Sequence, residues 1–271
     1  MSFQEKCKLC NKPCEHFAKS HLIPWGFQSR CEWANDMSLV SVGSRSRRMR
    51  KGVYDEHILC DGCEHDYFHD PDTYAIEIFR DHKGGIKQEV CFADGRKCLY
   101  YIFRDVNRRL LRAFFASVLW RCSVSNLECV SSVRIGKRYE ERITNDLKNK
   151  GFFNWIDAIG IVFDSDNQDV IIQGMNDGFV LPEKTQIKYA NRVANGYNIY
   201  LPKMKFCVSL DQRINPFAIM GDELARFVDG FENVSPSLAQ DNDGKDFVLF
   251  ESEFPISLAR KIMYACRNEP I

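Results

Sequence analysis

Two cysteine pairs with identical spacing constrain this chain more than any other feature of its sequence. Cys7 and Cys10 form the first pair, and Cys60 and Cys63 form the second. A C-x-x-C turn presents two thiolates at the separation of two corners of a zinc tetrahedron, so two such turns complete one site. We therefore predict one structural Zn²⁺ on these four residues. Four unrelated core cysteines would be the alternative, but it leaves the shared spacing unexplained.

Cysteine and histidine are concentrated in the same part of the chain. Six of the twelve cysteines lie in the first 63 residues, and all six histidines lie in the first 82. The N-terminus does not resemble a signal peptide, and no apolar run approaches the roughly 20 residues that span a bilayer. We therefore expect a cytoplasmic protein without membrane contact, in which clustered cysteines indicate metal binding rather than disulfides.

The cysteines outside the two pairs have other expected roles. Cys14 or His16 could replace one zinc ligand, although their spacing is less suitable. The others are isolated in the sequence and are expected in the hydrophobic core: Cys31, Cys91, Cys98, Cys122, Cys129, Cys207 and Cys266.

Length and hydrophobic patterning predict an α+β protein in three parts. With 271 residues, 45% of them hydrophobic, the chain can bury a substantial core. Residues 1–82 form the cysteine and histidine module, with short strands and turns. Residues 83–150 are predicted to be basic and mainly helical. Residues 151–271 are predicted to combine helices with a mainly antiparallel sheet, and a partner protein or a second copy could bind there.

The individual elements follow from hydrophobic spacing and turn residues. Apolar residues at intervals of three and four predict a helix over 100–123, and a polar helix is expected over 137–150. Residues 83–98 are expected to form a loop or hairpin, and residues 64–79 one or two short helices broken near Pro71. The last part is expected to contain strands over 159–163, 170–172, 197–201 and 205–210, and helices over 215–232 and 255–267.

The formal net charge of zero conceals an uneven distribution. Residues 83–150 carry 15 basic and 7 acidic side chains, a net charge of +8. Residues 1–82 carry 11 and 13, a net charge of −2, and residues 151–271 carry 11 and 17, a net charge of −6. The basic middle segment could bind a polyanion, or it could be an ordinary charged helical surface.

A second basic feature lies between the two cysteine pairs. Residues 43–52 contain five positive charges, no negative charge and a glycine at each end, which predicts a flexible loop. Such a loop could hold a phosphate backbone or simply be solvated. We expect nucleic acid as the partner, with DNA favoured over RNA. The candidate phosphate contacts are Arg45, Arg47, Arg48, Arg50 and Lys51 in this loop, and Arg108 and Arg112 in the predicted 100–123 helix.

One histidine stands in a distinctive setting. The run Ser20-His21-Leu22-Ile23-Pro24 begins ten residues after the first cysteine pair. A histidine at a strand end can be fixed in one orientation, although an isolated histidine is more often a buried core residue. The second cysteine pair is followed directly by Glu64 and His65, at an expected helix start. These polar residues could converge on one cleft.

The order C-x-x-C, S-H-x-I-P and aliphatic-L-C-x-x-C-E resembles the treble-clef HNH endonucleases, and among them uncharacterised bacterial members with a Ser-His-Ile-Ile-Pro core. The resemblance covers about residues 5–80, with weaker similarity at residues 115–121 and 136–141. It implies a ββα fold in which His21 acts as the general base. Asp55 would lie near the family's central asparagine, and Glu64 would occupy the third position with His65 beside it.

The same resemblance implies an activity and a setting. It implies metal-dependent hydrolysis of phosphodiester bonds, with Mg²⁺ or Mn²⁺ in addition to the structural Zn²⁺, and a biological setting in bacterial antiviral defence. Most members carry Asp or Glu immediately before the first histidine as a metal ligand, whereas this chain has Ser20. Asp55 and Glu64 replace Asn and His or Asn, although both offer oxygen ligands that Mg²⁺ accepts.

Two functions follow from these residues. The chain is expected to be an HNH-type endonuclease. Because of Ser20, it could instead be a catalytically degenerate, zinc-finger-like module that binds nucleic acid or a protein partner without cleaving.

Overall fold

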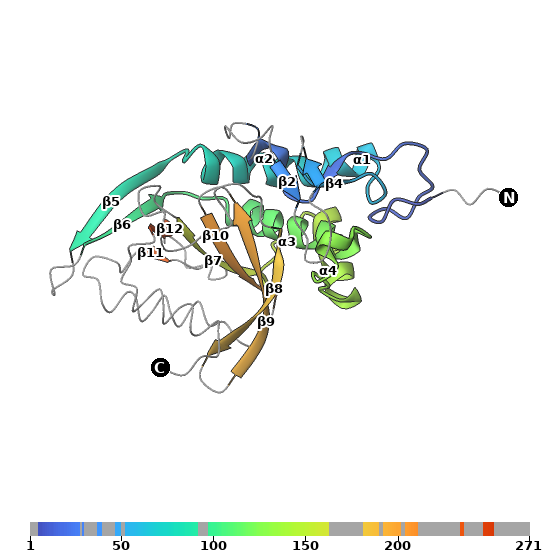
Figure 1. The fold of residues 1–271 in the computed structure, drawn as a ribbon. Coiled ribbons are helices and arrows are strands. Elements are labelled where there is room, and N and C mark those ends of the chain that lie inside the picture. The colour runs from blue at the N-terminus through green and yellow to red at the C-terminus, as the bar shows by residue number, and fades with distance from the viewer. Residues whose placement is uncertain are drawn as a thin grey trace.

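The computed structural model describes residues 5–27, 29, 37–39, 47–49, 52–91, 97–162, 181–189, 192–201, 204–210, 234–235 and 246–251. These residues combine helices with mostly antiparallel strands, which confirms the α+β class. Figure 1 shows the large sheet toward the left and the N-terminal part toward the right. The division into three parts stays a prediction.

The N-terminal part contains two small antiparallel strand pairs. β1 (Ser20–His21) pairs with β4 (Tyr54–Asp55), and β2 (Met37–Leu39) pairs with β3 (Arg47–Met49). Residues 47–49 of the predicted flexible loop over 43–52 therefore form a strand, so the expectation is wrong for these residues. The charges of Arg47 and Arg48 do not prevent a strand, because charged side chains are well tolerated on short edge strands.

A single helical segment begins within the second cysteine pair, directly after Cys60. It consists of α1 (Asp61–Cys63), a π-helical turn (Glu64–Phe68), α2 (His69–Ala75) and a second π-helical turn (Ile76–Arg80). The predicted break near Pro71 does not occur, since Pro71 lies inside α2. The wider π turn just before it relieves the clash that a proline ring makes with the preceding helical turn.

Among the described residues, eight strands form the main sheet, in the order β5-β6-β12-β7-β10-β9-β8, with β11 beside β12. β12 runs parallel to β7 and to β11, and the other neighbours are antiparallel, as predicted for most of the sheet. The predicted strand over 170–172 and the helices over 215–232 and 255–267 lie outside the described residues. The strands are β5 (Gly85–Cys91), β6 (Lys97–Phe103), β7 (Asp157–Val162), β8 (Glu183–Tyr189), β9 (Arg192–Leu201), β10 (Met204–Ser209), β11 (Val234–Ser235) and β12 (Asp246–Glu251).

The helix predicted over 100–123 begins later than expected. Residues up to Phe103 belong to β6, which pairs with β5 and β12, and α3 spans Arg108–Val124. Asp105 has a φ of 51°, which breaks the strand, and the Asn107 side chain accepts a hydrogen bond from the Leu110 N–H (3.1 Å). Asn107 is thus the N-cap of α3. Asparagine is a typical N-cap residue and could have marked this helix start, but the prediction followed the apolar spacing, which continues before it. The predicted polar helix is α4 (Lys137–Lys148).

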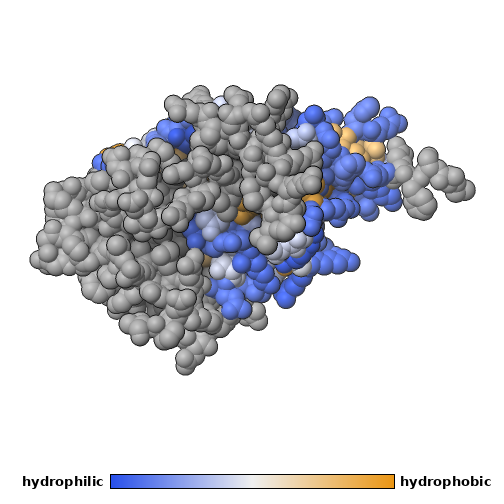
Figure 2. Space-filling view, viewed as in Figure 1, coloured by the Kyte–Doolittle hydropathy of each residue, from blue (hydrophilic) through white to orange (hydrophobic). Residues whose placement is uncertain are grey.

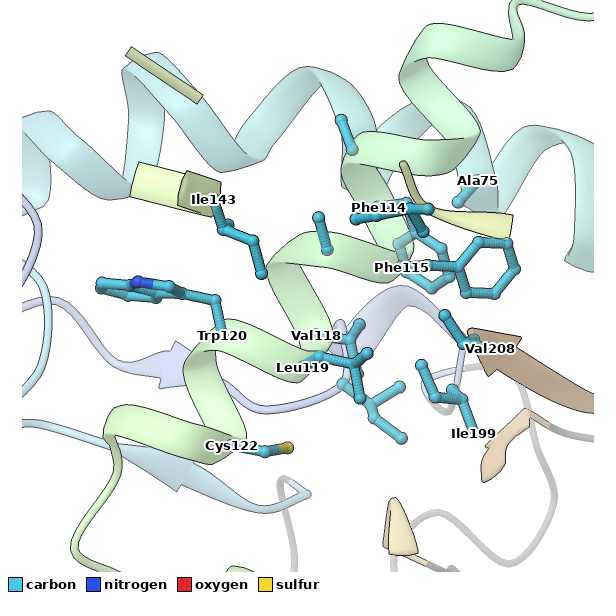
Figure 3. Close-up of a cluster of buried hydrophobic side chains, with 14 of the residues drawn as sticks. Ala75, Phe114, Phe115, Val118, Leu119, Trp120, Cys122, Ile143, Ile199 and Val208 are labelled. Carbon is cyan, nitrogen blue, oxygen red and sulfur yellow. The ribbon is translucent and has the colours of Figure 1, made fainter. Parts of the chain in front are cut away.

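α3 is the central element of the core. Its residues 111–123 are all buried, as expected for a helix surrounded by other elements. The Phe114 ring lies 6.3 Å from that of Phe79 in the helical segment, and the Phe115 ring lies 5.0 Å from that of Phe206 in β10. Figure 3 shows this cluster, with α3 between the helical segment and the ends of β9 and β10. One connected core therefore joins the N-terminal part to the sheet.

The predicted core cysteines differ in burial. Cys122 is buried in α3, and Cys129 and Cys207 are half-buried. Cys31 and Cys266 lie outside the described residues, and for Cys91 and Cys98 the structure describes the strand backbone only.

The described surface is mostly polar. The coloured residues in Figure 2 are mostly hydrophilic with small hydrophobic spots, and the exposed large hydrophobic residues of the described part are Ile86 and Phe152. None of the described helices is both long and apolar enough to cross a membrane.

Candidate functional site

The two cysteine pairs come together in space, as predicted. The Sγ atoms of Cys7, Cys10, Cys60 and Cys63 all lie within 4.8 Å of one another. Tetrahedral Zn²⁺ with bonds of about 2.3 Å requires sulfurs about 3.8 Å apart, so small side-chain adjustments suffice to close the site. The donor set and its geometry therefore fit zinc.

Local backbone structure explains this meeting. The first pair lies on a tight hairpin in which the Cys7 N–H donates to the Lys12 carbonyl (3.0 Å). The Lys8 N–H donates to the Ile58 carbonyl (2.8 Å), which holds the hairpin beside the second pair. Cys14 and His16 do not belong to the cluster, and the Cys14 thiol instead donates to the His16 carbonyl (2.6 Å).

The pKa values of Cys7 and Cys63 are shifted in opposite directions within the cluster. Burial disfavours the Cys7 thiolate, but backbone N–H groups of Leu9, Cys10 and Cys60 stabilise it and lower its pKa to about 7. Burial raises the pKa of Cys63. A divalent cation would stabilise all four thiolates together, which is why such sites couple metal binding to folding.

β1 and β4 carry the predicted general base, His21, and the predicted metal ligand Asp55. Their register sets Ser20 opposite Asp55 and His21 opposite Tyr54. The His21 side chain is half-buried, with its ring centroid 6.2 Å from that of Trp25 and 5.6 Å from that of Tyr54. His21 therefore has two aromatic neighbours, on a strand that follows the bridge between Phe17 and Cys60.

A hydrogen bond links the histidine strand to the helical segment. The buried Ser20 hydroxyl donates to Glu64 Oε2 (2.8 Å). Ser20 precedes His21, and Glu64 follows Cys63 of the four-cysteine cluster. Ser20 thus has a definite partner in the helical segment.

Glu64 also belongs to a buried ion network that the sequence did not predict. Arg121 on α3 has a fully buried side chain and contacts both carboxylate oxygens of Asp72, at 2.6 and 3.4 Å, and Glu64 Oε1 at 3.3 Å. The guanidinium lies 4.5 Å from the Phe68 ring centroid. Burial raises the pKa of Asp72, while the charge of Arg121 opposes that shift. Arg121 lies within the 115–121 segment that carried the weaker family similarity.

Replacing Arg121 by methionine should destabilise the protein strongly. The change leaves Asp72 buried without its cation, and removing one partner of a buried pair costs about 3–5 kcal/mol. Urea denaturation should show this loss as a lower midpoint. Arg109→Met on the same helix is the control and should change the free energy of unfolding by less than about 0.5 kcal/mol, because Arg109 is partly exposed. Equal effects of the two variants would contradict the prediction.

Asp55 is engaged differently from the prediction. It is 5% exposed, its Oδ1 accepts the His57 N–H (2.8 Å), and its Oδ2 accepts the Ser125 hydroxyl (2.6 Å). Oδ2 thus joins β4 to the residue that follows α3, and Oδ1 holds the turn after β4. Glu64 likewise has a partner on each oxygen.

The described residues do not present a preformed Mg²⁺ or Mn²⁺ site. Among them, the four cysteines are the only group of three or more close metal-ligating side chains. His65 is exposed on the helical segment, where its ring lies 5.5 Å from that of His69. The acidic and histidine residues assigned to a second metal therefore do not gather around one point.

The predicted phosphate contacts are only partly described. Arg45, Arg50 and Lys51 lie outside the described residues, and for Arg47 and Arg48 the structure gives the backbone of β3. Arg108 is half-buried at the start of α3.

The assignment of Arg112 to nucleic-acid binding requires correction. Arg112 is 1% exposed, and its guanidinium donates to Asn154 Oδ1 (3.0 Å). α3 is buried on all sides at this position, so polar residues on it are not solvent-facing. Arg112 therefore joins α3 to the segment before β7 and is withheld from a phosphate backbone.

Comparison with known proteins gave no match to a protein-family model, a curated protein or a solved structure.

Proposed function

We propose that this protein is a nucleic-acid phosphodiesterase of the HNH type, built on a treble-clef zinc module. The observation that carries the proposal is the Ser20–Glu64 hydrogen bond, which joins the residue before His21 to the residue after the last zinc ligand. A strand pair followed by a helix, β1–β4 and the segment from Asp61 to Arg80, is the arrangement that the ββα resemblance implies.

In this proposal His21 accepts the proton of the attacking water. An imidazole can exchange protons near neutral pH, and the neighbouring rings of Trp25 and Tyr54 limit its orientations. Ser20 and Glu64 fix the strand that carries it. Zn²⁺ on the four cysteines would hold the strand pair and helix together and take no part in the chemistry.

Mg²⁺ or Mn²⁺, when bound, would supply a Lewis acid at the scissile phosphate. Glu64 is the most accessible of the predicted carboxylate ligands, at 27% side-chain exposure. Since the described residues present no complete site for that ion, we assign it no ligand geometry.

The occupied carboxylates favour a second candidate function. Asp55 and Glu64 already accept hydrogen bonds on both oxygens. The position before His21, where the resemblance implies an acidic metal ligand, holds Ser20 instead. A zinc-stabilised module that binds nucleic acid or a protein partner without cleaving would need no metal ligands there. Residues 151–271 would then be one place for a partner protein or second copy.

Cleavage assays separate the two candidates. Supercoiled plasmid, single-stranded DNA and total RNA are incubated with zinc-loaded protein, with and without added Mg²⁺ or Mn²⁺. The control reaction contains no added Mg²⁺ or Mn²⁺. A chelator is not used for this control, because it would also remove zinc. The nuclease proposal expects ion-dependent cutting of at least one substrate. Binding without cutting under all conditions would support the second candidate.

The salt dependence of binding tests the basic residues 43–52, which we call the basic insertion. Neutralising Arg45, Arg47, Arg48, Arg50 and Lys51 together should weaken nucleic-acid binding and flatten its dependence on salt. Each lost phosphate contact should lower the log–log slope by roughly 0.7–0.9. Fluorescence anisotropy over a range of NaCl concentrations measures both quantities.

A matched neutralisation elsewhere serves as the control for the basic insertion. Lys137, Arg138, Lys148 and Lys150 are exposed on and after α4. Neutralising them should leave the slope unchanged. An unchanged slope in the insertion variant, or a larger loss in the α4 variant, would contradict the assignment.

A further inference from the structure

Three rings cluster on the β1–β4 strand pair. His21 is a neighbour both of Trp25, whose ring is inclined by 27° to it, and of Tyr54, whose ring is inclined by 59°. All three residues are half-buried, so each keeps part of its surface accessible. The exposed Lys19 places its Nζ 5.5 Å from the Tyr54 ring centroid and 3.5 Å from the carboxylate of the exposed Glu56. The cluster thus combines partly accessible aromatic surface with a cation in an exposed ion pair.

The sequence between Trp25 and Tyr54 carries further positive charge. The basic insertion, residues 43–52, lies between these two residues along the chain. Lys51, its last cation, is three residues before Tyr54 in the sequence. The insertion therefore adjoins Tyr54 in the sequence.

Aromatic rings beside cations are the elements that bind unpaired bases. Stacking needs an accessible base face, which single strands offer and an intact duplex withholds. An acidic protein partner would use the cations but would gain little from the ring faces.

We infer that Trp25 and Tyr54 form a stacking platform for an unpaired nucleobase, so that the protein acts on single-stranded nucleic acid. The inference rests on the proposed function, because it places a substrate base next to His21.

Binding of fluorescein-labelled 15-mers, measured by anisotropy without Mg²⁺ or Mn²⁺, tests this platform. Wild-type protein should bind oligo(dT) or oligo(U) more tightly than a duplex of the same length. Trp25→Ala should weaken single-strand binding about 5- to 100-fold, the loss expected for one stacked base. Trp25→Phe should recover most of the affinity, because it keeps a ring.

Phe152→Ala is the matched control. Phe152 is 69% exposed and lies before β7, so its loss should leave binding unchanged. Zinc content and far-UV circular dichroism are measured for each variant. The tryptophan fluorescence of wild-type protein should be quenched by oligo(dT), and Trp25→Phe should lose that quenching, which gives a second readout if Trp25→Ala does not fold.

The outcomes separate the platform from the nuclease. Single-strand affinity or quenching that is insensitive to Trp25, or tighter binding of the duplex, would overturn the platform even if the protein cleaves. Trp25-dependent binding of single strands with no cleavage under any ion would support the platform and overturn the nuclease. Absence of binding to every oligonucleotide would overturn the platform in favour of a protein partner.

Discussion

Cys63→Ser protein should lose its zinc and the fold of the N-terminal part. The four sulfurs lie within 4.8 Å of one another, and structural zinc contributes on the order of 10 kcal/mol to folding. That contribution is comparable with the whole stability of a domain, about 5–15 kcal/mol. Elemental analysis should fall from one zinc per chain to none, and the thermal transition should shift to much lower temperature or disappear.

Cys14→Ser is the control for this experiment. Cys14 is close to the cluster in sequence, but its thiol donates to the His16 carbonyl and it is outside the four-sulfur group. Its replacement should keep one zinc per chain and the wild-type transition. Wild-type protein purified without chelators and found free of zinc would contradict the site itself, and zinc loss in Cys14→Ser would assign the ligands differently.

The zinc cluster could be predicted from the sequence because its information is local. Each C-x-x-C turn fixes two sulfurs by itself, and only the meeting of the two turns depends on the fold. The antiparallel sheet was predictable for the same reason, since strands such as 204–209 are bounded by turn residues.

Elements that depend on distant partners were harder to predict. Residues 100–103 have apolar spacing that fits a helix, but pairing with β5 and β12 makes them a strand. Pro71 indicates a break unless the preceding turn widens, as it does here. Tertiary context overrides local preference in both cases.

The interior charges were the least predictable feature. A sequence does not distinguish Arg112 and Arg121, which are buried, from Arg108 and Arg109 on the same helix, which are partly exposed. Arg121 reaches Asp72 across 49 positions, and Asp55 reaches Ser125 across 70. Such pairs become visible only when the elements have been placed in space. The two carboxylates predicted as metal ligands have such partners: Asp55 accepts a hydrogen bond from Ser125, and Glu64 contacts Ser20 and Arg121.

His21→Ala should abolish most cleavage while leaving the fold intact. General-base catalysis typically contributes about 10²–10⁴-fold, and the variant should lose activity by that factor. Its zinc content should stay at one per chain, because His21 is outside the four-sulfur cluster. Its affinity for nucleic acid should change little, since phosphate contacts are expected from the basic insertion. Cleavage rate, zinc content and thermal midpoint are measured on one preparation.

His16→Ala, which changes an exposed histidine near the zinc hairpin, should match wild-type protein in all three quantities. A purely structural role for His21 predicts a different pattern. Truncating a buried, hydrogen-bonded histidine would cost about 1–3 kcal/mol of stability, because its partners would be left unsatisfied. Lost stability with unchanged cleavage per folded molecule would therefore contradict the catalytic assignment. Intact stability with lost cleavage would support it, because the half-buried ring beside Trp25 and Tyr54 would then be needed for the reaction and dispensable for packing.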